Sequence, residues 1–199
     1  MSFARVRALT IVGALFACAV IFVVMALVKD TQTTANTTNE CPAGFVQADL
    51  RLPEEKNIKI RVYNATDRQS LADGVAADFE NREFTVVNRP DINKGKANNP
   101  LGGKPVTGVV ALRYGPKGVG SAWVVRAYFI AVTNENFTAE FDLKRADDPA
   151  TKDVDEREIV DVIVGAKFQK LGTVTEVNQS LAALGTPELP KGTCNTNAR

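Results

Sequence analysis

The sequence predicts an α/β fold, with an α+β arrangement as the alternative, in one domain that follows a single membrane-spanning helix. Three observations predict it. Residues 8–28 carry no charge, apolar residues then recur with alternating strand and helix periods, and two cysteines bracket that region. We expect a mixed β-sheet packed by about three helices.

Residues 8–28 predict a transmembrane helix. At about 1.5 Å per residue this segment would reach about 31 Å, enough to cross a hydrocarbon core of about 30 Å. Arg5 and Arg7 precede it. Because basic residues favour the cytoplasmic side, residues 1–7 are expected in the cytoplasm and the remainder outside it. The predicted location is the cell membrane, with one span and an extracytoplasmic C-terminal domain.

Two alternatives for this segment are a cleaved signal peptide and a lipoprotein attached at Cys18. Signal peptides usually have a shorter apolar core and a small-residue cleavage site, which "VMALVKD" does not offer. Phe16 is bulky for a lipoprotein site, and ten more apolar residues follow Cys18. We therefore expect an uncleaved anchor.

Charge and composition exclude several function classes. The net charge of the 199 residues is +1, and all 23 acidic residues lie beyond the predicted span. This is far from the dense basic surface that nucleic-acid binding needs, so no nucleic acid is expected as a partner. The chain has no histidine. Ser-His-Asp and Cys-His catalytic arrangements and most zinc sites are therefore excluded.

Residues 29–40 are polar and rich in threonine, and are predicted to form a flexible linker to a domain over 41–199. Cys41 and Cys194 lie near the two ends of that domain. In an oxidising compartment they allow one intramolecular disulfide, worth about 5 kcal/mol in the chain-entropy model. Free thiols or an intermolecular bond are the alternatives.

The first predicted unit is strand, helix, strand. Alternating apolar residues predict a strand over 58–63, apolar residues at helical spacing predict a helix over 71–79, and a second strand covers 84–87. Thr66 and Gln69 have the spacing of a capping box at the helix start.

A second unit follows a long loop over 88–106. We expect a strand over 108–113, a helix over 119–130 and a strand over 137–143. The last of these alternates cleanly between apolar and polar residues, which is typical of antiparallel sheet with one solvated face.

The final segment contains a charged loop, a strand and a helix. The loop, 145–158, is expected to be solvated. Residues 159–165 are apolar on both faces apart from Asp161, which predicts a central strand. Thr173 and Glu176 predict a capping box for a helix that ends at Gly185.

Carboxylates are the remaining candidates for chemistry. Six of them cluster in the charged loop, but without the glycine and spacing of a calcium-binding loop. Nothing in the sequence selects a carboxylate pair, although a periplasmic glycan-processing enzyme using one stays the alternative. We expect no catalytic residue, metal or cofactor. The clustered residues are Asp147, Asp148, Asp153, Asp155, Glu156 and Glu158.

Two loops are candidates for binding. The Asn64–Ser70 turn precedes a helix, whose N-terminus attracts anions, and the 88–106 loop carries an excess of basic residues suited to anionic wall polymer or lipid head groups. The alternatives are a helix cap and a soluble loop. The candidate residues are Asn64, Thr66, Asp67, Ser70, Arg89, Lys94, Lys96 and Lys104.

Residues 58–87 resemble the start of the LytR C-terminal domain family, and "ALRYGPKGVGSA" resembles its second strand, turn and helix; the resemblance covers about residues 55–190. The matching residues in the first unit are Asn64, Thr66, Leu71, Ala72, Phe84 and Val86. Where the family usually has glycine, this chain has Ala65, Asp67, Ser70 and Glu83.

The resemblance implies a stand-alone, non-catalytic envelope protein. With one preceding span, the chain is similar to actinobacterial members that support envelope integrity. The implied partners are peptidoglycan or another wall polymer, or envelope proteins.

Overall fold

The computed structural model describes residues 41–87, 99–130, 132–133, 135–145 and 155–195. The chain divides into two units, Met1–Asn39 and Glu40–Arg199, and only the second contains described residues. The predicted span, 8–28, and the predicted linker, 29–40, therefore lie outside them. Among the helices that are described, none has the length and apolar character to cross a membrane.

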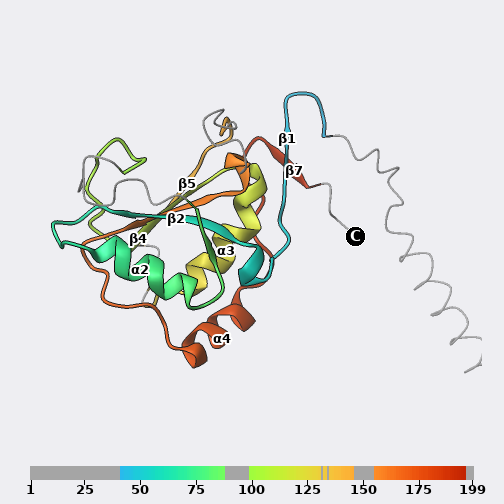
Figure 1. Cartoon of the computed structure of the whole chain (residues 1–199). Coiled ribbons are helices and arrows are strands. Elements are labelled where there is room, and N and C mark those ends of the chain that lie inside the picture. Colours follow the sequence, from blue (N-terminus) through green and yellow to red (C-terminus); the bar gives the residue numbers. More distant parts are fainter. Residues whose placement is uncertain (1–40, 88–98, 131, 134, 146–154, 196–199) are drawn as a thin grey trace, which may run out of the picture. The chain divides into compact units, whose positions relative to one another are not determined.

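The domain is built on a five-stranded mixed sheet with the order β3-β2-β6-β4-β5 (Figure 1). Strand β2 runs parallel to its neighbours β3 and β6, and β4 runs parallel to β5 but antiparallel to β6. The strands are β2 (Lys59–Asn64), β3 (Thr85–Val86), β4 (Val110–Tyr114), β5 (Phe137–Phe141) and β6 (Val160–Val164).

Two strand-helix-strand units flank the central strand β6. Helix α2 (Leu71–Glu80) connects β2 to β3, and α3 (Val119–Ala127) connects β4 to β5. Helix α4 (Val174–Ala183) follows β6. The described residues thus contain a mixed sheet and three α-helices, as predicted. Short 3₁₀ turns cover Glu55–Asn57 (η1), Pro116–Gly118 (η3) and Glu156–Glu158 (η4).

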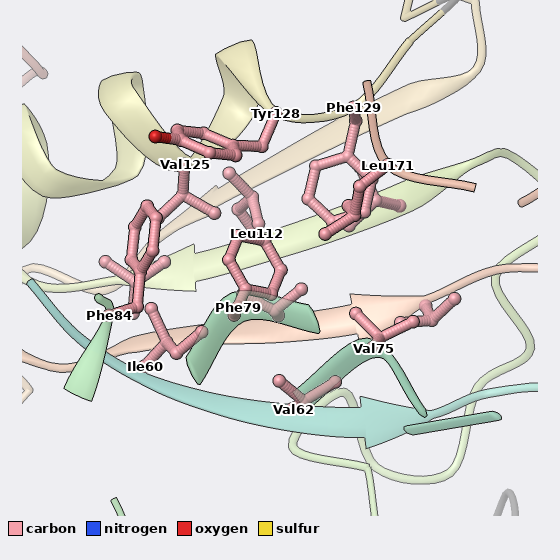
Figure 2. Close-up of a cluster of buried hydrophobic side chains, with 14 of the residues drawn as sticks. Ile60, Val62, Val75, Phe79, Phe84, Leu112, Val125, Tyr128, Phe129 and Leu171 are labelled. Carbon is pink, nitrogen blue, oxygen red and sulfur yellow. The ribbon is translucent and has the colours of Figure 1, made fainter. Parts of the chain in front are cut away.

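The main core lies between one face of the sheet and the helices, with Phe79 of α2 near its centre (Figure 2). Phe79 meets Phe84 edge to face with ring centroids 4.9 Å apart, and Phe84 meets Tyr128 at the same distance. Such pairs add about 0.5–1.5 kcal/mol each beyond the burial of apolar area. The periodicity of 71–79 predicted this buried helix face correctly.

Strand β6 is central and all five of its residues are buried, as the sequence predicted. The prediction of antiparallel pairing for β5 is wrong, because β5 pairs parallel with β4. Alternation reports only that one face of a strand is solvated. Here the exposure comes from the edge position of β5 rather than from its direction.

The start of α2 differs from the prediction. The helix begins at Leu71 rather than after Thr66, and Ser70 is its N-cap with φ 54°, making no side-chain capping bond among the described residues. The Thr66 hydroxyl instead donates to Asn64 Oδ1 (2.8 Å) and accepts from the Arg68 N–H (3.1 Å). The predicted Thr66–Gln69 capping box is therefore wrong. The Thr173–Glu176 box at α4 is confirmed.

The two ends of the domain meet in a separate parallel ladder. Strand β1 (Val46–Ala48) pairs with β7 (Thr193–Asn195), and beside them a disulfide joins Cys41 to Cys194 with their Cα atoms 5.8 Å apart. The predicted intramolecular bond is confirmed in this structure. It closes a loop with a sequence separation of 153.

Removing this bond should weaken the fold without abolishing it. We expect Cys194→Ser to lower the free energy of unfolding by about 2–5 kcal/mol, because the unfolded chain regains loop entropy. Urea unfolding followed by fluorescence of the single tryptophan measures this. A reducing agent should shift the wild-type midpoint equally and leave the variant unchanged. A wild-type midpoint insensitive to reduction would contradict the assignment.

Among the described residues, two that are not glycine occupy backbone conformations that favour glycine. Ser70 has φ 54° and Glu83 has φ 71°. Both stand at positions where the family that the sequence resembles usually has glycine. Left-handed geometry costs a non-glycine residue about 1–2 kcal/mol. We expect Ser70→Gly and Glu83→Gly each to stabilise the domain by about 0.5–1 kcal/mol after the entropy of glycine is counted.

The control for this prediction is Ser180→Gly in the exposed part of α4. Its backbone is helical, so the same change should destabilise by about 0.5 kcal/mol. Lower urea midpoints for both Ser70→Gly and Glu83→Gly would show that the strain is not real.

Candidate functional site

The sheet has a second face that points away from the helices. Helices α2, α3 and α4 pack on the face that carries Ile60, Val110 and Val162. The alternate residues of the same strands form the second face, because side chains alternate along a strand. We define the second face as Lys59, Arg61, Tyr63, Ala111, Arg113, Thr138, Glu140, Asp161 and Ile163.

A row of alternating charge crosses this face in register. Arg61 of β2 lies opposite Asp161 of β6, and Asp161 lies opposite Arg113 of β4. Arg113 in turn lies opposite Glu140 of β5. Opposite charges on directly facing residues stabilise neighbouring strands. The row therefore favours this order of strands over alternatives.

Arg145, which follows β5 in the chain, pairs with the central carboxylate of this row. Its Nη1 donates to Asp161 Oδ2 (2.9 Å), and its Nε donates to the Glu156 carbonyl oxygen (2.9 Å). The Glu156 carboxylate pairs with Arg61 and lies 3.7 Å from Arg145 Nη2. Asp161 is 2% exposed and Glu156 is 6% exposed. The loop 145–158 was predicted to be solvated, which is wrong for Glu156.

The two buried carboxylates differ from catalytic acids in their surroundings. Burial raises the pKa of Asp161, and the Arg145 guanidinium opposes that effect. Asp161 Oδ1 has no hydrogen-bond partner among the described residues. The side chain is nevertheless buried, with Arg145, Arg61 and Arg113 close enough to influence its pKa. A glycosidase pair must reach its substrate. Asp161 and Glu156 are therefore structural charges.

An open groove of about 330 Å³ lies beside the charge row, between residues 100–108 and strands β4 and β5. Lys104 lines it, together with the carboxylates of Glu135 and Glu140. The other lining residues are Pro100, Leu101, Pro105, Val106, Thr107, Gly108, Ala111, Asn136 and Thr138. The lining can donate and accept hydrogen bonds on a partly apolar floor.

Local bonds fix the shape of the groove. Asn99 is buried; its amide nitrogen donates to the Lys104 carbonyl (3.0 Å) and its Oδ1 accepts from the Leu101 N–H (3.0 Å). Gly108 permits a close backbone approach, since a Cβ there would lie 2.2 Å from the Asn136 carbonyl oxygen. The backbone of Lys104 is thus held by the Asn99 side chain, while the Lys104 side chain is exposed.

The Asn64–Ser70 turn reaches the same edge of the sheet as residues 101–106. Ala65 packs in a small apolar cluster with Val106, Ala111 and Ile163. Within the turn, Asn64 Nδ2 donates to the Arg68 carbonyl (2.6 Å), and Arg68 Nη2 donates to the Phe168 carbonyl (2.8 Å). The turn is therefore braced by its own side chains.

The predicted binding residues are distributed as follows. Asn64 and Thr66 bond to each other within the turn, while Asp67 and Ser70 are exposed. Lys104 lines the groove. The groove lining that is described has one ammonium and two carboxylates, so the predicted excess of positive charge rests on Arg89, Lys94 and Lys96, which lie outside the described residues. The binding role of all eight stays a prediction.

Sequence reasoning missed Arg145, Glu156 and Asn99 as organising residues. One signal was available for the first two. Asp161 interrupts an otherwise apolar, fully buried strand, so it requires a buried partner of opposite charge from elsewhere in the chain. No such signal marks Asn99 inside a polar loop. Among the described residues, no cluster of acidic residues or cysteines could hold a metal ion.

A larger cavity, of about 610 Å³, lies between residues 47–57 and the start of α3. Its charges are already engaged: Arg51 pairs with Asp49, Lys117 with Asp155, and Glu158 with Lys59. A ligand would have to break these pairs. The groove beside β5 is therefore the better candidate site.

The Arg145 cluster yields a pH-dependent prediction. Arg145 lowers the pKa of Asp161, in opposition to burial, which raises it. In the variant Arg145→Met the pKa of Asp161 in the folded protein should therefore rise further above its value in the unfolded chain. Stability of the variant should then fall as pH rises between these two values. We expect a loss of about 3–5 kcal/mol near pH 7.5 and a smaller loss near pH 5. Urea titrations at both pH values measure it.

Arg51→Met is the matched control, because Arg51 is exposed and its pair with Asp49 lies at the surface. That variant should lose less than about 1 kcal/mol at either pH. An equal loss for Arg145→Met at both pH values would show that the buried carboxylates do not couple to Arg145.

Comparison with known proteins places the chain in a family. The family described as "LytR cell envelope-related transcriptional attenuator" (LytR_C) matches residues 57–168. A solved structure, the soluble domain of a conserved hypothetical secreted protein (Rv2700 ortholog) from Mycobacterium marinum, is similar at 21% identity and a TM-score of 0.46, covering 72% of this chain and 84% of that one. No curated protein matches the chain. Because the family match spans more than half of the 199 residues, the chain belongs to the LytR_C family.

Proposed function

We propose that the chain is a membrane-anchored, extracytoplasmic, non-catalytic protein that supports the cell envelope by binding wall polymer or an envelope partner protein. Membership of an envelope-related family supports the cellular setting. The uncharged segment 8–28 supports the anchor. The Cys41–Cys194 bond supports an oxidising compartment, since such bonds are rare in the cytosol.

The observation that carries a binding role is the groove beside β5. It is open to solvent, and its lining includes Thr107, Thr138, Asn136 and Lys104, whose side chains carry hydroxyl, amide and ammonium groups; Asn136 Oδ1 also accepts from the Thr133 N–H. Such groups can bond to the hydroxyl, amide and carboxylate groups of a wall glycan. Wall polymer is therefore the ligand class we favour for this site.

A glycan-processing enzyme is the second candidate, and one observation favours it. Glu135 and Glu140 line the same groove, and glycoside hydrolysis needs two carboxylates. However, the Glu140 side chain is about half exposed and lies 3.8 Å from Arg113 Nε. A general acid of this class usually sits in an apolar pocket. The geometry thus supports recognition better than hydrolysis.

Co-sedimentation of the full chain, in detergent micelles, with isolated cell-wall polymer tests the binding role. We expect the combined change Lys94→Glu, Lys96→Glu and Lys104→Glu, and separately Thr138→Arg, to weaken association about tenfold, equivalent to about 1.4 kcal/mol. The first removes positive charge from the 88–106 loop, including that of Lys104 in the groove lining, and the second places a larger side chain in the groove. Melting temperatures should stay unchanged, since Lys104 and Thr138 are exposed.

Lys170→Glu is the control, because this exposed lysine lies outside the groove lining. It should bind like the wild type. Binding that survives both groove variants would remove the groove from the proposal. Polymer cleavage that is abolished by Glu135→Gln or Glu140→Gln would replace the proposal with the enzyme alternative.

A further inference from the structure

The first described residues of the domain form an exposed apolar turn. We define the apolar tip as Pro42–Val46. All five of its residues are exposed, and no charged residue occurs from Cys41 to Gln47. Phe45 is 49% exposed and Val46 is 41% exposed. Phe45 directly precedes β1 and Val46 begins it, so apolar surface is exposed where this strand starts.

Exposed apolar side chains gather near this end of the domain. Among the described residues, five large hydrophobic side chains are exposed, and three of them, Phe45, Val46 and Leu52, fall within eight positions of one another. A fourth, Leu189, lies four residues before Thr193, which pairs with Val46 across the ladder. Single exposed hydrophobic residues are ordinary, but a local concentration marks an interaction surface.

The tip is held rigidly. Phe45 N–H donates to the Pro42 carbonyl (3.0 Å) across a turn with Gly44 at φ 87°, the conformation that a type II turn requires at its third position. Val46 N–H donates to the Gly192 carbonyl (3.1 Å), and the disulfide at Cys41 closes the base. Phe45 and Val46 are therefore presented to solvent by a braced structure.

The position of the tip in the chain indicates its occupant. The uncharged segment ends at Val28, and twelve residues, 29–40, separate it from Cys41. At no more than about 3.6 Å per residue, these residues keep the tip within about 45 Å of the membrane surface. We infer that the apolar tip rests on the bilayer in which the chain is anchored, with the Phe45 side chain at the level of the head groups. This inference rests on the membrane anchor of the proposed function.

The chemistry of the tip suits a lipid interface. Phenylalanine and other large apolar residues bind at the boundary between head groups and acyl chains. In the segment that leads into β7, Glu188 and Lys191 carry opposite charges and flank Leu189 and Pro190. Contact should therefore occur on zwitterionic phosphatidylcholine and should depend little on anionic lipid. A water-soluble protein partner is the competing occupant.

Tryptophan quenching by brominated phosphatidylcholine tests the inference in the full chain, reconstituted into vesicles. Phe45→Trp adds one reporter at the tip, and Val174→Trp adds one on α4, which lies well away from β1 and β7 (Figure 1). Val174 is 72% exposed, so both changes are made at the surface. The unaltered chain gives the baseline from Trp123, its single tryptophan. We expect the added emission at 45 to fall about twofold on brominated lipid, and the added emission at 174 to be unchanged.

Flotation of the same vesicles separates the two proposals. A chain that floats while the reporter at 45 is unquenched overturns the resting tip and leaves the anchor intact. A chain that does not float overturns both. Equal quenching at 45 and 174 also overturns the inference, because the contact would then not be specific to the tip.

Discussion

Strand β6 is buried on both faces, and its Asp161 places a carboxylate at the centre of the sheet. A buried charge is tolerated only when it is paired and hydrogen-bonded. Arg145, which follows β5, supplies the direct pair, while Arg113 on β4 and Arg61 on β2 flank it in register. Because the charge of Asp161 must be balanced, the central strand, its two neighbours and the segment after β5 are linked through this one carboxylate.

The charged half and the apolar half of the second face of the sheet are covered by different kinds of side chains. Arg145 and Glu156 cover the charged row, whereas Leu101 and Val106 cover the apolar residues Ala111 and Ile163. The groove lies where residues 100–108 pass over β4 and meet β5. Its floor is therefore part of the rigid sheet and one wall is a loop braced by Asn99, an arrangement suited to binding without large movement.

The turn after β2 shows why a motif can be read correctly and still be assigned the wrong role. Thr66 does bond to backbone and side-chain neighbours, as its position near a helix start indicated, but it serves the turn rather than the helix. Ser70 takes the N-cap position in a left-handed conformation. Residue type predicts that a hydroxyl will find a local partner, and several partners within four residues are close in energy.

The sequence by itself determined several elements of this domain, namely the buried face of α2, the central place of β6 and the cap of α4, and it favoured the pairing of Cys41 with Cys194. These follow from local periodicity and from short-range or covalent chemistry. Only the tertiary structure decided that β5 runs parallel to β4, that Glu156 is buried, and that Lys104 shares a groove with Glu135 and Glu140. Strand direction and charge pairing join residues far apart in the chain, and their energies depend on register and burial, which local patterns do not encode.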